Sequence, residues 1–358
     1  MKKKLRIAMF CSTEWPTPPP QDVIFAPLWI HYYVAEGLAK RGHEVFYFGP
    51  KESKMKYAKL VSCDMSAMRN NTELFPLVSM KTRWEAVIFY EQTFISKMYE
   101  MNSKKKFDVI HTYRNSFPFA SLTKTPTVVT IHDPIEKIRK YRYEWTRQFP
   151  QIHFISISDA QRSPAPDLNY LDTIYHGIDL RRFQFNAKPD DYFVIAGRML
   201  QRKGIGIAIQ VAKKAGVKLK IAGGPAKGLY WEKSIKPYLG KDIEYVGMVD
   251  YYCMGDFFRK AKGFISPQRW NEPFGLTFVE AMACGTPVIT FHRGSAPEVV
   301  AHGKTGFVVR SVPQMIEAIK NVDTIKREDC RKHVEEHFSV KKMVDRYEEV
   351  FLKLAESK

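Results

Sequence analysis

The sequence has few cysteines, and no two of them stand in a Cys-x-x-Cys spacing. The five cysteines (Cys11, Cys63, Cys253, Cys284 and Cys330) are scattered through 358 residues. This distribution predicts neither a disulfide framework nor a zinc site. It favours a reducing compartment, so we expect a cytoplasmic protein.

Long apolar runs are also missing. The nearest approach to a membrane span is residues 23–39, which contain Pro27, His31 and Glu36 and fall short of about 20 clean apolar residues. We therefore expect a buried helix there. The start of the chain lacks the apolar core and the small-residue cleavage site of a signal peptide, so no signal peptide is expected.

Several nucleotide and metal motifs are absent. The chain contains neither G-x-G-x-x-G nor G-x-x-x-x-G-K-[ST], so redox dinucleotide binding and P-loop chemistry are unsupported. No Asp-x-Asp occurs either, so we expect no metal ion to hold a diphosphate. The sequence thus predicts no metal and no cofactor, and any nucleotide that binds would be part of the substrate.

Acidic residues are scarce relative to basic ones. The chain has 56 Lys and Arg against 38 Asp and Glu, a formal charge of +18. Nucleic acid, an anionic membrane surface at the inner face of a membrane, or a diphosphate substrate would each fit this charge. A merely solubilising surface is the plain alternative. Nucleic acid is disfavoured, because no helix-turn-helix, zinc finger or RNP-type aromatic motif accompanies the charge.

The length and the order of apolar segments predict two domains. The first half opens with a strand over residues 5–10, a proline-rich loop over 11–21, a helix ending before Gly42 and a strand over 45–48. This β-loop-α-β unit begins a doubly wound sheet, whose ligands lie beyond the carboxyl ends of the strands. Residues 51–71 mix Lys with Met and predict a solvated loop or an irregular helix; a surface that faces a membrane or an acceptor is the alternative.

The second half repeats this order of elements. A strand over residues 192–196, a loop over 197–204, a helix over 205–215 and a strand over 219–222 follow one another. The fold class predicted is therefore α/β, with two Rossmann-like domains facing across a cleft. We expect the linker at 183–191.

One stretch, residues 271–289, combines a loop, a helix and a strand. Pro273 and Gly275 precede an apolar segment over 276–283 that predicts a helix, whose first N–H groups are free to bind an anion. Glu272 stands just before this helix and Glu280 near its middle. Carboxylates beside an anion site favour a ligand with both phosphates and hydroxyls, such as a sugar nucleotide. The alternative is that both glutamates are merely solvated and that the rest of the stretch only packs in the core.

Two cations leave the carboxyl end of the first strand of the second half. Arg198 and Lys203 lie in the loop over 197–204. Two interpretations are open: both are ordinary surface cations, or together they bind a phosphate group. Their predicted place beside the helix that follows Gly275 favours phosphate binding.

The first half places polar side chains at strand ends. His111 ends a strand over residues 107–111, and His132 and Asp133 follow a strand over 126–131. We expect these tips in the cleft, although a lone histidine there is commonly structural. Residues 135–149 then interleave five Lys and Arg with aromatic residues, which suits nucleic acid, lipid headgroups, an acidic acceptor or a solvated helix.

The Glu-x7-Glu pattern from Glu272 to Glu280 resembles the signature of the retaining family-4 glycosyltransferases, which have the GT-B fold. The resemblance extends over most of residues 192–309 and more weakly over the first half. It implies an acceptor-binding domain over 1–183, a nucleotide-sugar-binding domain over 184–339, and a helix over 340–358 that crosses back to the first domain.

The resemblance also implies roles for individual residues. The catalytic residues would be Glu272, which holds the sugar hydroxyls, and His132, which faces the transferred sugar. The implied donor-binding residues are Arg198, Lys203, Gly247, Val249, Phe274, Gly275, Leu276, Thr277 and Glu280, and the implied acceptor-side residues are His111 and Asp133.

The implied reaction moves a hexose from a nucleotide diphosphate sugar to a hydroxyl of a glycan, a lipid or a small molecule. A UDP-sugar is the favoured donor, and GDP-mannose is the next. Configuration is retained, and the leaving phosphate takes the acceptor proton without a metal. The chain departs from the family where a Gly-Gly pair is usual, because Pro16, Pro18, Pro19 and Pro20 occupy that loop. A catalytically silent nucleotide- or membrane-binding protein, and a GT-B epimerase or phosphorylase, are therefore alternatives.

Overall fold

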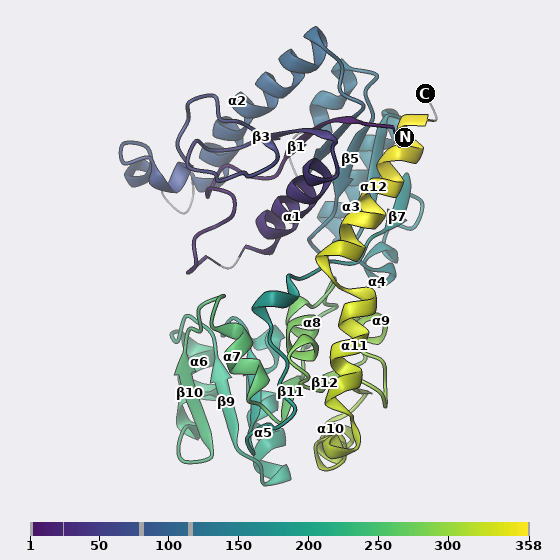
Figure 1. Cartoon of the computed structure of the whole chain (residues 1–358). Coiled ribbons are helices and arrows are strands. Elements are labelled where there is room, and N and C mark those ends of the chain that lie inside the picture. The colour runs from purple at the N-terminus through teal and green to yellow at the C-terminus, as the bar shows by residue number, and fades with distance from the viewer. Residues whose placement is uncertain (1–2, 24, 79–81, 114–116, 357–358) are drawn as a thin grey trace. The chain divides into compact units, whose positions relative to one another are not determined.

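The computed structural model describes residues 3–23, 25–78, 82–113 and 117–356. The chain folds into two compact units. The first comprises residues 1–157, 162–174 and 340–358, and the second comprises 158–161 and 175–339. Each unit is built around its own β-sheet (Figure 1). Residues 158–161 enter the second unit briefly, and the main passage into it comes after Ile174, upstream of the linker expected at 183–191.

The first unit contains a seven-stranded parallel sheet in the order β3-β2-β1-β4-β5-β6-β7. Its strands are β1 (Arg6–Phe10), β2 (Glu44–Phe48), β3 (Lys59–Val61), β4 (Val109–Thr112), β5 (Thr127–Thr130), β6 (Ile152–Ser156) and β7 (Tyr170–Thr173). The strand order reverses between β1 and β4, which is where doubly wound sheets bind ligands. The short edge strand β3 lies inside the stretch that was expected to be a loop.

Helices cover both faces of this sheet. The helical segments of the first unit include α1 (Ala26–Lys40), α2 (Arg83–Lys104), η3 (Phe117–Leu122), α3 (Lys137–Glu144), η4 (Trp145–Gln148) and α12 (Val340–Glu356). The short helix α4 (Asp159–Arg162) belongs, except for Arg162, to the second unit. Helices α1 and α12 pack together, and the Tyr347 hydroxyl of α12 is 2.9 Å from the Thr130 hydroxyl of β5. Segments α2, η3 and α3 form apolar clusters with alternate strand residues such as Ile110 and Val129, which point to the other face.

The helix expected at residues 23–39 is confirmed as α1. Its side chains Leu28, Ile30 and Val34 are buried against the sheet and α12. Within the residues that the structure describes, none of the helices has both the length and the apolarity that crossing a bilayer requires.

The second unit contains a six-stranded parallel sheet in the order β10-β9-β8-β11-β12-β13. Its strands are β8 (Phe193–Ala196), β9 (Leu219–Ala222), β10 (Ile243–Gly247), β11 (Gly263–Ser266), β12 (Val288–Phe291) and β13 (Gly306–Val309). Its helices are α5 (Ile205–Ala215), α6 (Leu229–Ser234), α7 (Met254–Arg259), α8 (Leu276–Ala283), α9 (Ala296–Val299), α10 (Val312–Lys320) and α11 (Arg327–His337). The strand order reverses between β8 and β11. Two parallel, doubly wound sheets confirm the predicted α/β, Rossmann-like class.

A buried arginine ties several segments of the second unit together. Arg327 is 8% exposed, and its guanidinium donates hydrogen bonds to the carbonyl oxygens of Asn186, Arg259 and Ala261 and to the Thr286 hydroxyl. Arg259 and Ala261 lie at the end of α7, Thr286 lies just beyond α8, and Asn186 lies in the segment that precedes β8. The cation therefore satisfies carbonyl groups that a helix end leaves without partners.

Replacing this arginine is expected to destabilise the protein. Arg327→Met keeps an apolar stem but leaves several buried acceptors unsatisfied, so we expect the free energy of unfolding to fall by about 3 kcal/mol in urea titrations. Lys332→Met, on the exposed side of the same helix, should change it by less than about 0.5 kcal/mol. Equal effects of the two substitutions would contradict the bracing role of Arg327.

Candidate functional site

The loop between β8 and α5 carries the predicted cations at the carboxyl end of the sheet. It contains η6 (Gln201–Lys203) and ends at Gly204, whose φ is 76°. A Cβ atom at Gly204 would lie 2.0 Å from the carbonyl oxygen of Pro267. Glycine at this position therefore lets the loop lie against the segment that follows β11, and Arg269 donates its N–H to the carbonyl of Arg202.

This packing brings Lys203 to Glu272. The Lys203 Nζ atom lies 2.8 Å from Glu272 Oε2, and the two side chains are 23% and 13% exposed. The ring centroid of Trp270 is 4.8 Å from Lys203 Nζ and 4.8 Å from the guanidinium of Arg202. The sequence predicted both members of the ion pair but neither their contact nor the two flanking residues.

Helix α8 begins and ends where the sequence predicted. Gly275 precedes it in a left-handed conformation with φ of 84°, and no side chain caps the helix. Phe278 donates its N–H to Gly275, whereas the N–H groups of Leu276 and Thr277 have no acceptor within the described part of the chain. The start of α8 therefore offers two free N–H donors and the positive end of the helix dipole. It follows Glu272 by four residues in the sequence.

A serine in the loop after β12 holds this segment in place. The Ser295 hydroxyl donates to the carbonyl of Phe274 at 2.7 Å, and its N–H donates to the carbonyl of Glu272 at 2.9 Å. A Cβ atom at Gly294 would lie 2.3 Å from that Glu272 carbonyl oxygen. Gly294 and Ser295 are supporting residues that the sequence analysis did not single out, although both lie within the range 192–309 over which the resemblance extends.

The side chain of Phe274, a residue predicted to bind the donor, is buried. Its side chain is 2% exposed and packs against His176 and Phe338, with ring centroids at 5.0 and 5.9 Å. The ring therefore anchors the loop in the core of the second unit, and only the backbone of Phe274 is placed to take part in a site.

Glu280 is a buried carboxylate. It is 7% exposed, and its side chain makes no hydrogen bond or ion pair in the described part of the chain. Burial raises the pKa of Glu280 to about 7. A buried carboxylate without partners is costly, so this position favours a ligand that brings hydroxyl donors to it.

The remaining predicted donor residues lie at the same edge of the sheet. Arg198 follows β8 and is exposed, with no side-chain partner among the described residues. Gly247 ends β10 and accepts a hydrogen bond from the N–H of Gly223, and Val249 follows half-buried. Because the strands are parallel, all three residues lie at the carboxyl edge from which Lys203 and Glu272 also project.

The structure corrects the expectation for His111. The side chain is fully buried, its ring lies parallel to that of His31 with centroids 4.6 Å apart, and its Nε2 atom is 2.8 Å from the Thr130 hydroxyl. Burial holds the pKa of His111 well below its usual value. His111 is thus a neutral core residue beneath α1 and α12, not an open strand tip, because two helices distant in sequence cover it.

His132 and Asp133 follow β5 at the carboxyl edge of the first sheet. The Tyr113 hydroxyl donates to Asp133 Oδ2 at 3.1 Å, and the Tyr113 ring lies edge-on to His132 with centroids 4.9 Å apart. His132 is 9% exposed. Tyr113, which the sequence analysis did not single out, therefore holds both predicted residues.

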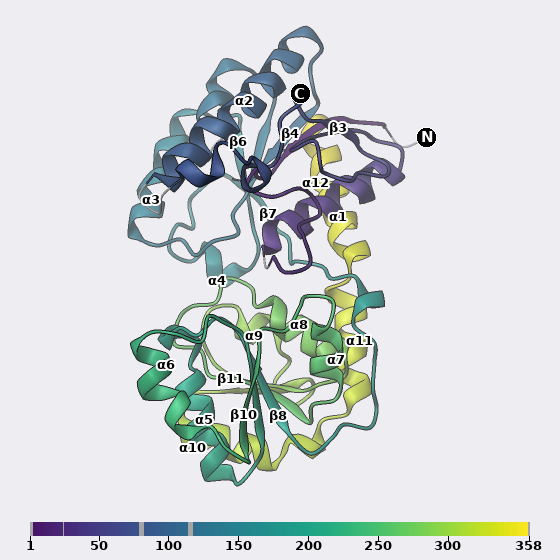
Figure 2. The same ribbon diagram turned by 90° about the vertical axis from the view of Figure 1, so that its left-hand side faces the viewer.

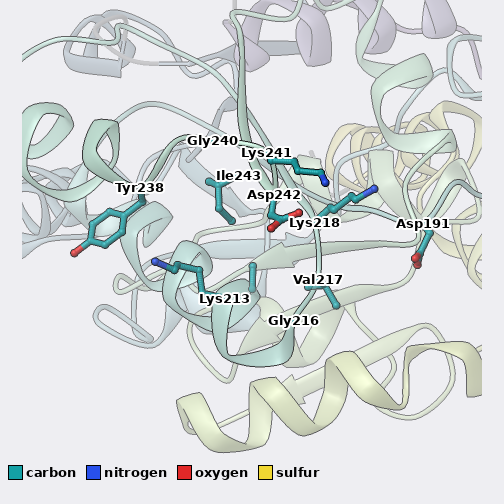
Figure 3. Close-up of a pocket in the computed structure, with 11 residues that line it drawn as sticks. Asp191, Lys213, Gly216, Val217, Lys218, Tyr238, Gly240, Lys241, Asp242 and Ile243 are labelled. Atoms are coloured by element: carbon teal, nitrogen blue, oxygen red, sulfur yellow. The ribbon is translucent and has the colours of Figure 1, made fainter.

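A cavity of about 460 Å³ lies elsewhere in the second unit (Figure 3). Lys213, Lys218 and Lys241 surround it, near the residues that precede β8, β9 and β10. This is the amino-terminal edge of the sheet, opposite the edge that carries Lys203. Ligands of doubly wound sheets bind at the carboxyl edge, so the cavity is not the predicted donor site.

Two family models match consecutive parts of the chain. The model described as "Glycosyltransferase Family 4" matches residues 31–182, and the one described as "Glycosyl transferases group 1" matches residues 178–337. Among curated proteins, O-antigen chain mannosyltransferase C of Escherichia coli is 24% identical over 91% of this chain and 94% of its own. A glycogen synthase of Mycobacterium tuberculosis is 29% identical over 44% of this chain and 41% of its own.

Solved structures share the fold over nearly the whole chain. Sucrose-phosphate synthase from Thermosynechococcus elongatus superposes with a TM-score of 0.77 at 18% identity, covering 99% of this chain and 100% of its own. The Anabaena protein HepE in complex with UDP superposes with a TM-score of 0.69 at 15% identity, covering 98% and 100%.

Proposed function

Because the chain belongs to the family-4 glycosyltransferases of the GT-B fold, we propose that it transfers a hexose from a nucleotide diphosphate sugar to an acceptor hydroxyl. The transfer proceeds with retention at the anomeric carbon and without a metal ion. One observation carries the proposal. Lys203 forms an ion pair with Glu272, and Glu272 lies four residues before Leu276, where α8 begins with free N–H groups.

Each group has a place in this chemistry. In the reaction, the bond between the anomeric carbon and the diphosphate oxygen breaks, and a bond to the acceptor oxygen forms on the same face of the sugar. The diphosphate gains negative charge, which Arg198, Lys203 and the start of α8 stabilise. The leaving phosphate oxygen takes the proton of the acceptor hydroxyl, so no side-chain base is required.

The ion pair implies an exchange of partners when the donor binds. In the structure the Lys203 ammonium donates a hydrogen bond to the Glu272 carboxylate. The diphosphate takes over the ammonium, and the Glu272 carboxylate is then free to accept hydrogen bonds from the sugar hydroxyls. The same pair re-forms as the nucleoside diphosphate leaves. Glu280 accepts the ribose hydroxyls, and the backbone around Gly247 and Val249 contacts the base.

We assign the acceptor to the first unit. His132 faces the transferred sugar, and Asp133 binds the acceptor hydroxyl-bearing group. His111 acts indirectly, by supporting the strand ends from the core. UDP-hexoses are the first donors proposed and GDP-mannose the second; a structural neighbour with bound UDP-glucose and a relative named as a mannosyltransferase support testing both.

A donor screen tests the proposal. The protein is incubated with UDP-glucose, UDP-galactose, UDP-N-acetylglucosamine and GDP-mannose, each with glycan, lipid and small-molecule acceptors, and release of nucleoside diphosphate is followed. We expect release with one donor class and an α-linked product from an α-linked donor. Tight nucleotide binding without release from any donor would favour a silent binding protein instead.

The pH dependence of nucleotide binding follows from Glu280. Its folded pKa, about 7, lies above the usual value of 4.5, so the empty protein holds a proton there that ribose binding must release. We expect nucleoside diphosphate affinity to rise between pH 6 and 8, by up to about tenfold per unit below the pKa. Calorimetric titrations of wild type and Glu280→Gln separate this effect from titration of the phosphate, because only the wild type should gain it.

Stability of the empty protein gives an independent readout of the same group. A raised carboxylate pKa means that the folded state binds more protons between pH 4.5 and 7, so stability falls as pH rises through this window. Glu280→Gln should therefore melt like wild type near pH 5 and be more stable at pH 8, by about 3 kcal/mol at most. Lower stability of the variant at pH 8 would show that the carboxylate has a partner in the empty protein.

A further inference from the structure

The segment formed by α3 and η4 covers residues 137–148, and over residues 140–148 it has one face in the core and one face in solvent. Tyr143 and Thr146 are buried, and the Tyr143 ring packs edge-on against Phe154 of β6 with centroids 5.5 Å apart. Figure 2 shows α3 at the margin of its unit. The inner side chains pack the segment against the sheet, so the positions of its outer side chains are fixed relative to the sheet.

The outer face carries aromatic side chains that serve no internal contact. Tyr141 is 61% exposed and Trp145 is 68% exposed, and they stand four residues apart on one side of the helical segment. No ring contact of either residue occurs among the described residues. Large aromatic side chains are seldom left in water to this extent, and clustered ones mark interaction sites.

Cations accompany these rings. Arg142 lies between them in sequence, is exposed and has no partner in the described part of the chain. In sequence, residues 135–149 contain five Lys and Arg and two Glu, in a protein that carries +18 overall. Exposed Trp and Tyr beside Lys and Arg form the side-chain set that binds the headgroup region of an anionic bilayer.

The segment also adjoins the residues assigned to the acceptor. Asp133 precedes the start of α3 by four residues, and Tyr113 holds it and His132 at the carboxyl edge of the sheet. Residues 137–148 span about 18 Å as a helix. A bilayer bound to this face would therefore lie close to the proposed acceptor loop.

We propose that the outer face of residues 140–148 docks on an anionic membrane surface, and that the acceptor is a lipid whose hydroxyl-bearing headgroup is presented there. The second clause rests on the proposed glycosyl transfer, and the first does not. The rings of Tyr141 and Trp145 enter the headgroup region, and Arg142 pairs with lipid phosphates.

Vesicle co-sedimentation without any donor tests the surface. At 0.15 M salt, we expect at least tenfold stronger binding to phosphatidylcholine vesicles with 30% phosphatidylglycerol than to pure phosphatidylcholine. Tyr141→Ser with Trp145→Ser should weaken binding at least tenfold, and Arg142→Gln about fivefold. The matched control, Leu229→Ser with Tyr238→Ser, removes two exposed apolar side chains of the second unit and should bind like wild type.

Thermal unfolding verifies that all variants remain folded, since every changed side chain is exposed. Equal binding to neutral and anionic vesicles, or undiminished binding of the Tyr141/Trp145 variant, would overturn the proposal. So would binding of a short RNA, lost in the same variants, in place of vesicle binding. For the acceptor clause, nucleoside diphosphate release should be faster with a glycolipid in vesicles than with its free headgroup; equal rates would overturn that clause while leaving transfer itself established.

Discussion

Lys203→Ala combined with Arg198→Ala is expected to lower the affinity for nucleoside diphosphate by about 10²- to 10⁴-fold. In the proposed site each cation contacts the diphosphate, and a charge-assisted contact contributes about 1.5–3 kcal/mol. The Lys203 Nζ atom lies 2.8 Å from Glu272 Oε2, so it is already held at the carboxyl edge of the sheet, where we propose that the diphosphate binds. Arg198 is exposed and has no competing partner among the described residues.

Isothermal titration with nucleoside diphosphate and with the corresponding nucleoside measures this effect. The double variant should lose affinity for the diphosphate and keep most of its affinity for the nucleoside, because the base and ribose contacts remain. Lys213→Ala combined with Lys218→Ala removes the same charge from the opposite edge of the sheet and serves as the matched control. Comparable losses in both double variants would show that only the net charge of the protein matters.

Glu272→Gln is expected to separate nucleotide binding from transfer. In the proposed mechanism the carboxylate accepts hydrogen bonds from the transferred sugar, so we expect the rate of transfer to fall by about 10²- to 10³-fold, as when a single catalytic hydrogen-bonding group is lost. The same change frees Lys203 from its partner in the empty protein. Affinity for nucleoside diphosphate should therefore rise, by about fivefold for a partly exposed ion pair.

These two signs distinguish an exchange of partners from simple damage to the loop. Titration with nucleoside diphosphate gives the affinity, and stopped-time assays with the donor identified in the screen give the transfer rate. A fall in both quantities would mean that Glu272 organises the loop over residues 267–275 instead of competing for Lys203. The backbone contacts of Glu272 with Ser295 do not involve its carboxylate, so Gln preserves them.

The parts of the fold that the sequence predicted are those with local signals. The bounds of α8 follow from Gly275 and Gly285 around an apolar run, and the loop that carries Arg198 and Lys203 follows from the strand and helix patterns on either side. Strands β3 and β7 escaped prediction because they are edge strands of three or four residues without a buried face. Their short sequences carry no alternation to detect.

Contacts between distant residues account for the rest. Lys203 and Glu272 are 69 positions apart, and their meeting depends on the close approach of Gly204 to Pro267. The flanking Trp270 and the bracing Ser295 are visible only once those loops are folded. His111 was misplaced because its burial depends on α12, more than 200 residues further along the chain, whose Tyr347 ring lies 5.3 Å from its own.

A crystal structure of the protein with bound nucleoside diphosphate tests the central claim most directly. We predict pyrophosphate oxygens within about 3 Å of Lys203 Nζ and of the N–H of Leu276 or Thr277, with Lys203 withdrawn from Glu272. A pyrophosphate bound at the amino-terminal edge near Lys213 and Lys218, or at the carboxyl edge with the Lys203–Glu272 pair intact, would contradict it.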